Sequence, residues 1–460
     1  MLRRVRKGKP EHPVDARPPG ENIDWRDIRE TRRVWMPDVG GDQRARLEFL
    51  ADQGLRLIMA DLGPASGETL HFFNPRDRET LHLRAGKEEN LLSESVRYFP
   101  QAARWIDLIR GSQMDGVETA AGAVFMERWG LLLEVSGGRV RRVYETASEY
   151  PQGALCGTRA RQAGFLLEKG GGMEGTARSA AFFQALEDAR GMKIPAAAVA
   201  IHAALLEMSR VCAHLFWISG AAGLLGRPGT AGRCAELRCE VEEGMEEWLG
   251  DPQGRGCFLP GGVREDFPVE EAPAMAERLV SAAGRWEEIS PKALSLPVPG
   301  WVERRLRSLY REAKKEGWVG PLARSAGLAA DVREEEPGPY AVVGWGGVKL
   351  PKGGGMFRRV VGVRAFEIGA SLHIAGRILE NIPEGPLQVK RGRGGRGEGF
   401  GRCEGPEGEV CCHVIMEKGQ VSSLAFSLPG ELNRSAARCL EGAWLDEVEL
   451  LSLLWEAPAT

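Results

Sequence analysis

The chain has 460 residues, 43% of them hydrophobic and 27% charged, which is enough for two or three domains with a sizeable core. Its formal net charge of −3 excludes a class of proteins that binds nucleic acid through a strongly basic surface. The nine cysteines are scattered without any C-x-x-C spacing, so the usual zinc and iron–sulfur ligand patterns are absent and reduced thiols are expected.

The first quarter of the chain predicts an arm followed by a small α/β domain. Residues 1–40 are rich in Pro, Arg and Glu, which predicts a flexible arm, and they lack the apolar region of a secretory signal. Residues 41–120 begin with the helical pattern RLEFLADQGL and continue with the alternating segments LRLIMADLG, ETLHFF and RETLHLRAG, which predict strands. The remaining residues, 121–460, make the large domain.

The large domain is predicted to be mainly helical. A hairpin turning at 136–138 precedes helices at 177–190, 195–225, 231–249, 272–288, 302–316 and 360–381, a second hairpin turning at 417–420, and a helix at 431–441. This order predicts the α+β class, a helical bundle with small antiparallel sheets. The apolar run at 211–225 is shorter than the roughly 20 residues that cross a bilayer, so no direct membrane span is expected.

Polar side chains interrupt the first long apolar helix. Glu207, Arg210 and His214 lie at i, i+3 and i+7, so they share one helix face. Burying such groups is unfavourable unless partners meet them. This stripe predicts either a satisfied core network or the border of a functional site.

A second stripe on the helix at 360–381 mirrors the first. Arg364, Glu367 and Ser371 repeat the same spacing, so opposed stripes are expected to pair Glu207 with Arg364 and Arg210 with Glu367. Two interpretations stay open, a structural ion-pair network and a route for protons.

Two glycine-rich segments need an explanation. KRGRGGRGEGFGR at 390–402 resembles an Arg-Gly nucleic-acid segment, but it lacks interleaved aromatic residues, which favours a flexible loop without nucleic-acid binding. LPKGGGMF at 350–357 lacks the order of a phosphate-binding loop and predicts a linker before the next helix.

Five motifs that follow one another along the chain indicate the family that it resembles. They are EKGGGMEGTARSAAFFQALEDARGMKIP at 168–195, LPGGVREDFP at 259–268, GWVGPLARSAGLAADVR at 317–333, RAFEIGASLHIAGRILENIPEGP at 364–386 and EGPEGE at 404–409. Together they resemble the large subunit of energy-converting and formate-hydrogenlyase-type [NiFe] hydrogenases, and equally the 49-kDa-type subunit of NADH–quinone oxidoreductase. The segment SESVRYFPQAARWIDLIRGSQMDGVE resembles, in degenerate form, the end of the 30-kDa-type subunit, which precedes the large subunit in formate-hydrogenlyase-like proteins.

The chain departs from the hydrogenase branch at its metal ligands. The family's first motif carries two cysteines, and their positions here are Gly171 and Glu174. The second cysteine pair expected near the C-terminus does not occur before the sequence ends in LLSLLWEAPAT. Because a nickel–iron centre needs soft sulfur donors, the resemblance implies that this chain carries no metal.

The chain also departs from the quinone-reducing branch. The tyrosine that hydrogen-bonds the quinone in that branch corresponds to Phe182, and the histidine-bearing loop has no match in AAGAVFMERWG. The arginine of the hydrogenase Glu-x-Pro-Arg-Gly-Glu motif corresponds to Glu407, a reversal of charge. No catalytic residue is therefore assigned, and quinone is retained only as a ligand that the resemblance implies.

The altered motifs nevertheless suggest where a site would lie. A remodelled pocket could take a proton or a hard cation on Glu174, or these residues could form a salt-bridged loop. The candidate pocket residues are Glu168, Glu174, Arg178, Phe182, Arg324, Asp331 and Arg333, and the candidate charge network is Glu207, Arg210, His214, Arg364 and Glu367.

The resemblance implies a subunit of a membrane-associated, ion-translocating oxidoreductase complex on the cytoplasmic face of the membrane. It would dock a small subunit that holds a [4Fe–4S] cluster, next to antiporter-like membrane subunits. Whether the chain itself retains catalysis is open. The alternatives are a non-catalytic structural subunit and a free-standing binding protein on the same fold.

Overall fold

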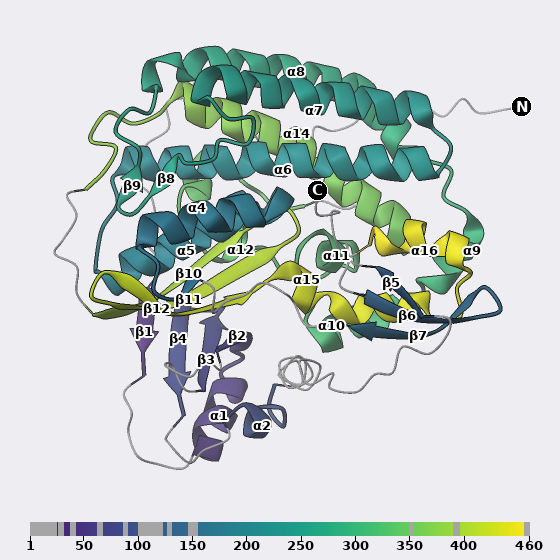
Figure 1. Ribbon diagram of the computed structural model, residues 1–460, viewed down its shortest axis with the longest axis horizontal. Helices are drawn as coiled ribbons and strands as arrows, with labels where there is room; N and C mark the ends of the chain where they lie inside the picture. The colour runs from purple at the N-terminus through teal and green to yellow at the C-terminus, as the bar shows by residue number, and fades with distance from the viewer. Residues whose placement is uncertain are drawn as a thin grey trace, which may run out of the picture.

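The computed structural model describes residue 25 and residues 32–36, 43–61, 68–85, 91–99, 123–126, 131–145, 155–348, 354–389 and 396–454. The fold is α+β, as predicted (Figure 1). Long helices form one layer, a three-stranded sheet lies beneath them, and a second sheet near the N-terminus lies below that.

The helical layer holds most of the core. It consists of α6 (Ala196–Leu224), α7 (Pro228–Leu249), α8 (Ala272–Leu294) and α14 (Met356–Glu380), which confirms the helices predicted there. Helix α6 is apolar almost all round and packs on both α14 and α7 (Figure 1).

Helix α6 corrects the argument about membrane spans. Its 29 residues exceed the apolar run used in the sequence argument, so by length and composition it passes as a spanning helix. However, 83% of its apolar window is buried inside the protein, which is the environment of a core helix.

Shorter elements connect the bundle to the sheets. The helix predicted at 302–316 is two helices, and no Gly or Pro marks the break. The helix predicted at 431–441 is a helical turn and a 3₁₀ segment, η7, and α16 was not predicted. These elements are α9 (Gly300–Arg305), α10 (Leu309–Glu316), α11 (Gly320–Ser325), α12 (Val332–Glu335), α13 (Tyr340–Val343), α15 (Pro429–Leu432), η7 (Arg434–Leu440) and α16 (Leu445–Ser452).

The central sheet corrects the prediction of a flexible Arg-Gly loop. Strand β10 (Gly397–Glu404) takes up the end of that segment and joins the predicted hairpin of β11 (Glu409–Glu417) and β12 (Gln420–Ser427) in the order β10-β11-β12. Alternate glycines face α5 (Gly175–Ala189), where a Cβ at Gly399 or Gly401 would collide with the helix backbone. The glycines therefore serve close packing of a strand on a helix.

The N-terminal sheet contains the strands expected in residues 41–120. Its order is β1-β4-β3-β2, from β2 (Arg56–Asp61), β3 (Thr69–Asn74) and β4 (Glu79–Arg84), with β1 (Arg32–Trp35) pairing parallel to β4. The predicted arm thus contributes a strand to this sheet. Helices α1 (Gln43–Asp52) and α2 (Leu91–Ser95) belong to the same region, whereas most of the 30-kDa-like segment lies outside the described residues.

Two further small sheets complete the described chain. The hairpin predicted around 136–138 is formed by β6 (Leu131–Ser136) and β7 (Arg139–Glu145), with β5 (Ala123–Met126) on the outer side of β6. A two-stranded ribbon, β8 (Phe258–Leu259) and β9 (Gly262–Val263), lies in the LPGG motif. The remaining helical segments are α4 (Ala160–Gly170), η5 (Gly172–Glu174) and η6 (Val269–Glu271).

Candidate functional site

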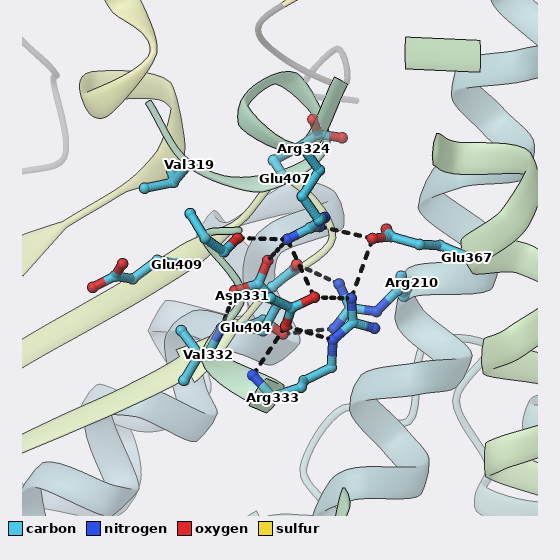
Figure 2. Close-up of polar contacts among 12 residues, drawn as sticks. Arg210, Val319, Arg324, Asp331, Val332, Arg333, Glu367, Glu404, Glu407 and Glu409 are labelled. Atoms are coloured by element: carbon cyan, nitrogen blue, oxygen red, sulfur yellow. Dashed lines mark hydrogen bonds and ion pairs between the residues drawn. The ribbon is translucent and has the colours of Figure 1, made fainter. Parts of the chain in front are cut away.

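Charged side chains meet in the interior where α6, α14 and the β10–β11 turn come together (Figure 2). All are at most 4% exposed. We call this set the ion cluster: Glu207, Arg210, His214, Arg324, Asp331, Arg333, Arg364, Glu367, Glu404 and Glu407.

Glu207 is the most heavily bonded carboxylate of the ion cluster. It lies 3.2 Å from Arg210 and 3.5 Å from Arg333, and it accepts hydrogen bonds from the hydroxyls of Tyr340, at 2.8 Å, and Ser371. Burial alone would raise the pKa of Glu207, but the two guanidinium groups outweigh burial and lower it to about 2. This carboxylate is therefore charged at neutral pH.

Glu367 is held in a similar way on the facing helix. Its Oε1 lies 2.8 Å from Arg324 and 3.2 Å from Arg333, and its Oε2 lies 2.7 Å from Nε2 of His214. Burial opposes ionisation, but the two arginines hold the pKa of Glu367 well below its usual range.

His214 is neutral and its tautomer follows from its partners. Burial lowers its pKa to about 4. Nδ1 lies 3.0 Å from Nη1 of Arg364, and because a guanidinium can only donate, Nδ1 must accept. The ring proton is then on Nε2 and points to Glu367.

Arginines also fix the β10–β11 turn. Arg364 donates from both terminal nitrogens to Glu407, with Nη1 at 2.7 Å, and Arg324 donates to Glu404 at 2.6 Å. Arg210 donates to the main-chain oxygens of Gly405, at 2.5 Å, and Glu404, at 2.8 Å. The turn that carries EGPEGE is thus tied to both long helices.

The structure places all five predicted network residues together but corrects their pairing. Arg210 bonds Glu207 on its own helix, one turn away, and Arg364 bonds Glu407. Arg324 and Arg333 take the remaining positions beside Glu367. The prediction compared only the two helices, so it missed the carboxylates and guanidinium groups that connecting segments supply.

The positions of the family's first two cysteines have different surroundings. A Cβ at Gly171 would lie 2.5 Å from Cα and 2.8 Å from N of Gly175, so no side chain fits there without a backbone shift. Glu174 is half-buried, and its Oε1 accepts from the main-chain N of Glu407 at 2.7 Å. Burial, followed by the charge of Glu407, raises the pKa of Glu174 to about 8. A nickel–iron centre needs soft sulfur donors. A glycine without room for a side chain and a protonated carboxyl group do not supply them.

The other predicted pocket residues do not form one pocket. Arg324, Asp331 and Arg333 belong to the ion cluster, where Asp331 lies 2.8 Å from Arg333. Glu168 instead accepts from the main-chain N of Gly256 at 2.8 Å, and burial raises its pKa to about 7. Phe182 packs in the core, 5.4 Å from Phe183 between ring centroids.

Arg178 lies one helical turn from Glu174 on α5, and its charge lowers the pKa of that carboxyl, against the larger effect of burial. The residues predicted to line one pocket therefore lie in different places: in the core, at the start of α5 and in the ion cluster.

Sequence reasoning missed a cleft of about 680 Å³ beside the ion cluster. It lies between the end of α5, the start of α6, the 332–340 segment and β10. The LPGG motif signals the region, since its two glycines contact side chains that line the cleft, Glu187 and His202. Among the described residues no group of three or more His, Cys, Asp or Glu side chains could hold a metal ion.

The comparisons with known proteins agree with the motifs. Residues 233–394 match the family of the respiratory-chain NADH dehydrogenase, 49 Kd subunit. A subunit of the NADH-quinone oxidoreductase of Desulfitobacterium hafniense is 26% identical over 51% of this chain and 64% of its own length. Formate hydrogenlyase subunit 5 of Escherichia coli is 29% identical over 49% of this chain and 40% of its own length. Over these segments the chain is similar to 49-kDa-type and hydrogenase large subunits.

Further relatives come from membrane complexes. Membrane-bound hydrogenase subunit alpha of Pyrococcus furiosus is 26% identical over 56% of this chain and 64% of its own length. A chain of the membrane-bound sulfane sulfur reductase, an archaeal respiratory membrane complex, matches with a TM-score of 0.61 at 22% identity, over 74% of this chain and 98% of that one. That likeness shows the shared fold. The chain spans at most 64% of the length of the curated relatives named here.

Proposed function

We propose that this chain takes the place of the large subunit in a membrane-associated, ion-translocating oxidoreductase complex. Where a hydrogenase has its nickel–iron centre, this chain would have buried carboxyl groups and arginines. It would lie on the cytoplasmic face, dock a small subunit with a [4Fe–4S] cluster, and adjoin antiporter-like membrane subunits. The similarity to 49-kDa-type subunits and the membrane complexes from which the relatives come support this proposal.

The observation that carries the proposal is the packing at the two former cysteine positions. Gly171 has no room for a side chain, and Glu174 is joined to the β10–β11 turn through the main chain of Glu407. The site thus has its own hydrogen-bonded arrangement, which leaves electron transfer to partners or to another acceptor. Quinone is the acceptor suggested by the names of the NADH-quinone oxidoreductase relatives.

The ion cluster gives the chain a means to move protons. Glu174 accepts from the main-chain N of Glu407, and the Glu407 carboxylate accepts from Arg364. Arg364 also donates to Nδ1 of His214, which donates from Nε2 to Glu367. Because a guanidinium keeps its protons, the groups of this series that can take up or release one are the carboxyl groups and the histidine. A neutral histidine between charged groups can pass a proton when the charge of a neighbour changes. We propose that this series couples a redox change in the partner subunit to protonation.

Purification of the complex from native membranes tests the placement. We expect the chain to copurify with an iron–sulfur protein and membrane subunits. Recovery of the chain alone, under conditions that preserve related complexes, would favour the free-standing binding protein.

Substitution of Glu367 separates proton coupling from a structural role. Glu367→Gln keeps the shape and a hydrogen bond to His214 but removes the charge, so the assembled complex should form and lose proton coupling. Glu336→Gln, which removes the charge of a carboxylate paired with Arg402 outside the ion cluster, is the matched control. Because every carboxylate in the ion cluster already has a guanidinium partner, a purely structural subunit is the second candidate, and unchanged coupling in Glu367→Gln would favour it.

A further inference from the structure

The cleft beside the ion cluster has no role in the function proposed above. Its volume of about 680 Å³ is in the range of clefts that hold organic ligands of moderate size. One wall is apolar and comes from the α5–α6 connection and the first turns of α6. The residues of that wall are Met192, Ile194, Ala196, Val199, Ala203 and Leu206.

Two buried side chains in the cleft are held by the LPGG motif. Gly261 N–H donates to Oε1 of Glu187 at 3.0 Å, and the main-chain oxygen of Gly262 lies 3.1 Å from Nε2 of His202. Glu187 and His202 are thus anchored to consecutive residues of one turn, and both line the cleft.

The glycine pair is required for this geometry. Gly261 and Gly262 have φ values of +87° and +140°, which side chains rarely allow. A Cβ at Gly261 would lie 2.6 Å from Cε of Met192, and a Cβ at Gly262 would collide with the main-chain oxygen of Leu387. The motif therefore places a main-chain donor and acceptor where no other residue type fits.

The hydrogen-bonding roles of the two side chains follow from these partners. A main-chain oxygen can only accept, so Nε2 of His202 carries the proton and Nδ1 has its lone pair available. Burial lowers the pKa of His202 to about 4, which keeps the ring neutral. Burial raises the pKa of Glu187 to about 8, so this group is a carboxylic acid at neutral pH, with one O–H to donate. The cleft thus offers one neutral acceptor and one neutral donor.

Charged side chains that line the cleft form ion pairs with other side chains. Arg33 lies 3.5 Å from Asp188, and Arg402 lies 2.8 Å from Glu336. Arg333 is bonded within the ion cluster. A charged ligand would have to disrupt one of these pairs, whereas an uncharged ligand need not.

We propose that this cleft binds an uncharged, planar ring of the lactam or imide type, which carries a ring N–H next to a carbonyl. The ring N–H donates to Nδ1 of His202, the carbonyl accepts from Glu187, and the flat face lies on the apolar wall. This site is independent of the function proposed above, because it needs neither a partner subunit nor a redox centre.

Fluorescence titration of the full chain with lumichrome, an uncharged tricyclic imide, tests the proposal. Saturable binding is expected, and His202→Phe, which keeps a ring for stacking on Phe258, should weaken it about tenfold by removing the acceptor. Glu187→Gln keeps a neutral donor and should bind like the wild-type chain, whereas Glu187→Met should lose about tenfold. Glu265→Gln, an exposed position on the same loop, is the control for each.

The pH dependence gives a second readout that does not depend on a variant with altered packing. Wild-type binding should weaken more than binding to Glu187→Gln as the pH rises through about 8, where Glu187 ionises, because any ionisation of the probe itself affects both proteins equally. Absence of saturable binding to the wild-type chain would contradict the proposal. Equal binding by wild type, His202→Phe and Glu187→Met, with native circular dichroism, would also contradict it.

Discussion

The ion cluster and the adjacent cleft bury carboxyl groups to a similar extent but leave them in opposite states. Glu207 is fully buried and its pKa falls to about 2, while Glu187 is 5% exposed and its pKa rises to about 8. Glu207 faces two guanidinium groups, and Glu187 has a main-chain N–H as its hydrogen-bond donor. Burial alone thus does not decide the charge of a carboxyl; the balance of cations and anions around it does, since Glu404, beside both Arg324 and Asp331, has its pKa raised.

Glu174 combines features of these two cases. Like Glu187 it accepts from a main-chain N–H and holds a proton at neutral pH, but it adjoins the ion cluster through Glu407. A cysteine-to-carboxyl replacement at this position therefore adds a protonated group to the edge of a charged core.

The largest expected effect comes from removing a guanidinium of the ion cluster. Arg324→Met leaves Glu367, Glu404 and Asp331 with one cation fewer, and breaking such a buried pair costs about 3–5 kcal/mol. Chemical denaturation should show this loss in the free energy of unfolding. The control is Arg396→Met, whose side chain is 84% exposed; a comparable loss there would refute the importance of burial.

The next effect is a pH dependence of stability in the cleft. The folded chain raises the pKa of Glu187 from 4.5 to about 8, so it keeps a proton that the unfolded chain releases. The free energy of unfolding therefore falls as the pH rises from about 5 to about 8, with a contribution of about 2–4 kcal/mol from this group. In Glu187→Gln this contribution vanishes. Parallel pH profiles for both proteins would show that Glu187 is ionised in the fold.

A smaller effect is expected at the former cysteine position. Gly171→Ala places a methyl group 2.5 Å from Cα of Gly175, and such overpacking costs about 1–3 kcal/mol. Gly284→Ala on α8 is the control, because no atom lies within 4 Å of its added Cβ. It should leave the midpoint of thermal unfolding unchanged or raise it. Equal stability of Gly171→Ala and the wild-type chain would show that a side chain fits at position 171.

The smallest effect should come from a single hydroxyl in the ion cluster. Tyr340→Phe removes the 2.8 Å hydrogen bond to Glu207 and leaves its arginine partners, so a loss of about 1–2 kcal/mol is expected. Tyr98→Phe, a half-buried position in the N-terminal region, serves as the substitution control. A loss as large as that of Arg324→Met would mean that the hydroxyl, and not the guanidinium groups, keeps Glu207 charged.

The sequence predicts this protein well where one periodic pattern decides the structure. The long helices and both hairpins follow from apolar spacing and turn residues, and the motif order indicates the family that the comparisons match over part of the chain. The ion cluster was partly predictable because three polar residues on an apolar helix require partners. Their identity was not, since Arg324, Arg333 and Glu407 come from segments without periodicity.

Two features could not be predicted from the sequence, each for a physical reason. Strand β10 is rich in glycine, which lowers its apparent strand propensity, yet glycine is what lets it approach α5. The cleft forms from segments that lie far apart in the sequence, so no local pattern marks it. The LPGG motif indicated a conformational requirement, but only the structure shows which side chains it holds.

Metal analysis of the complex purified from membranes tests the central claim most directly. The account predicts iron from the partner subunit and no stoichiometric nickel, because Gly171 and Glu174 replace two sulfur donors. One nickel per chain would contradict it.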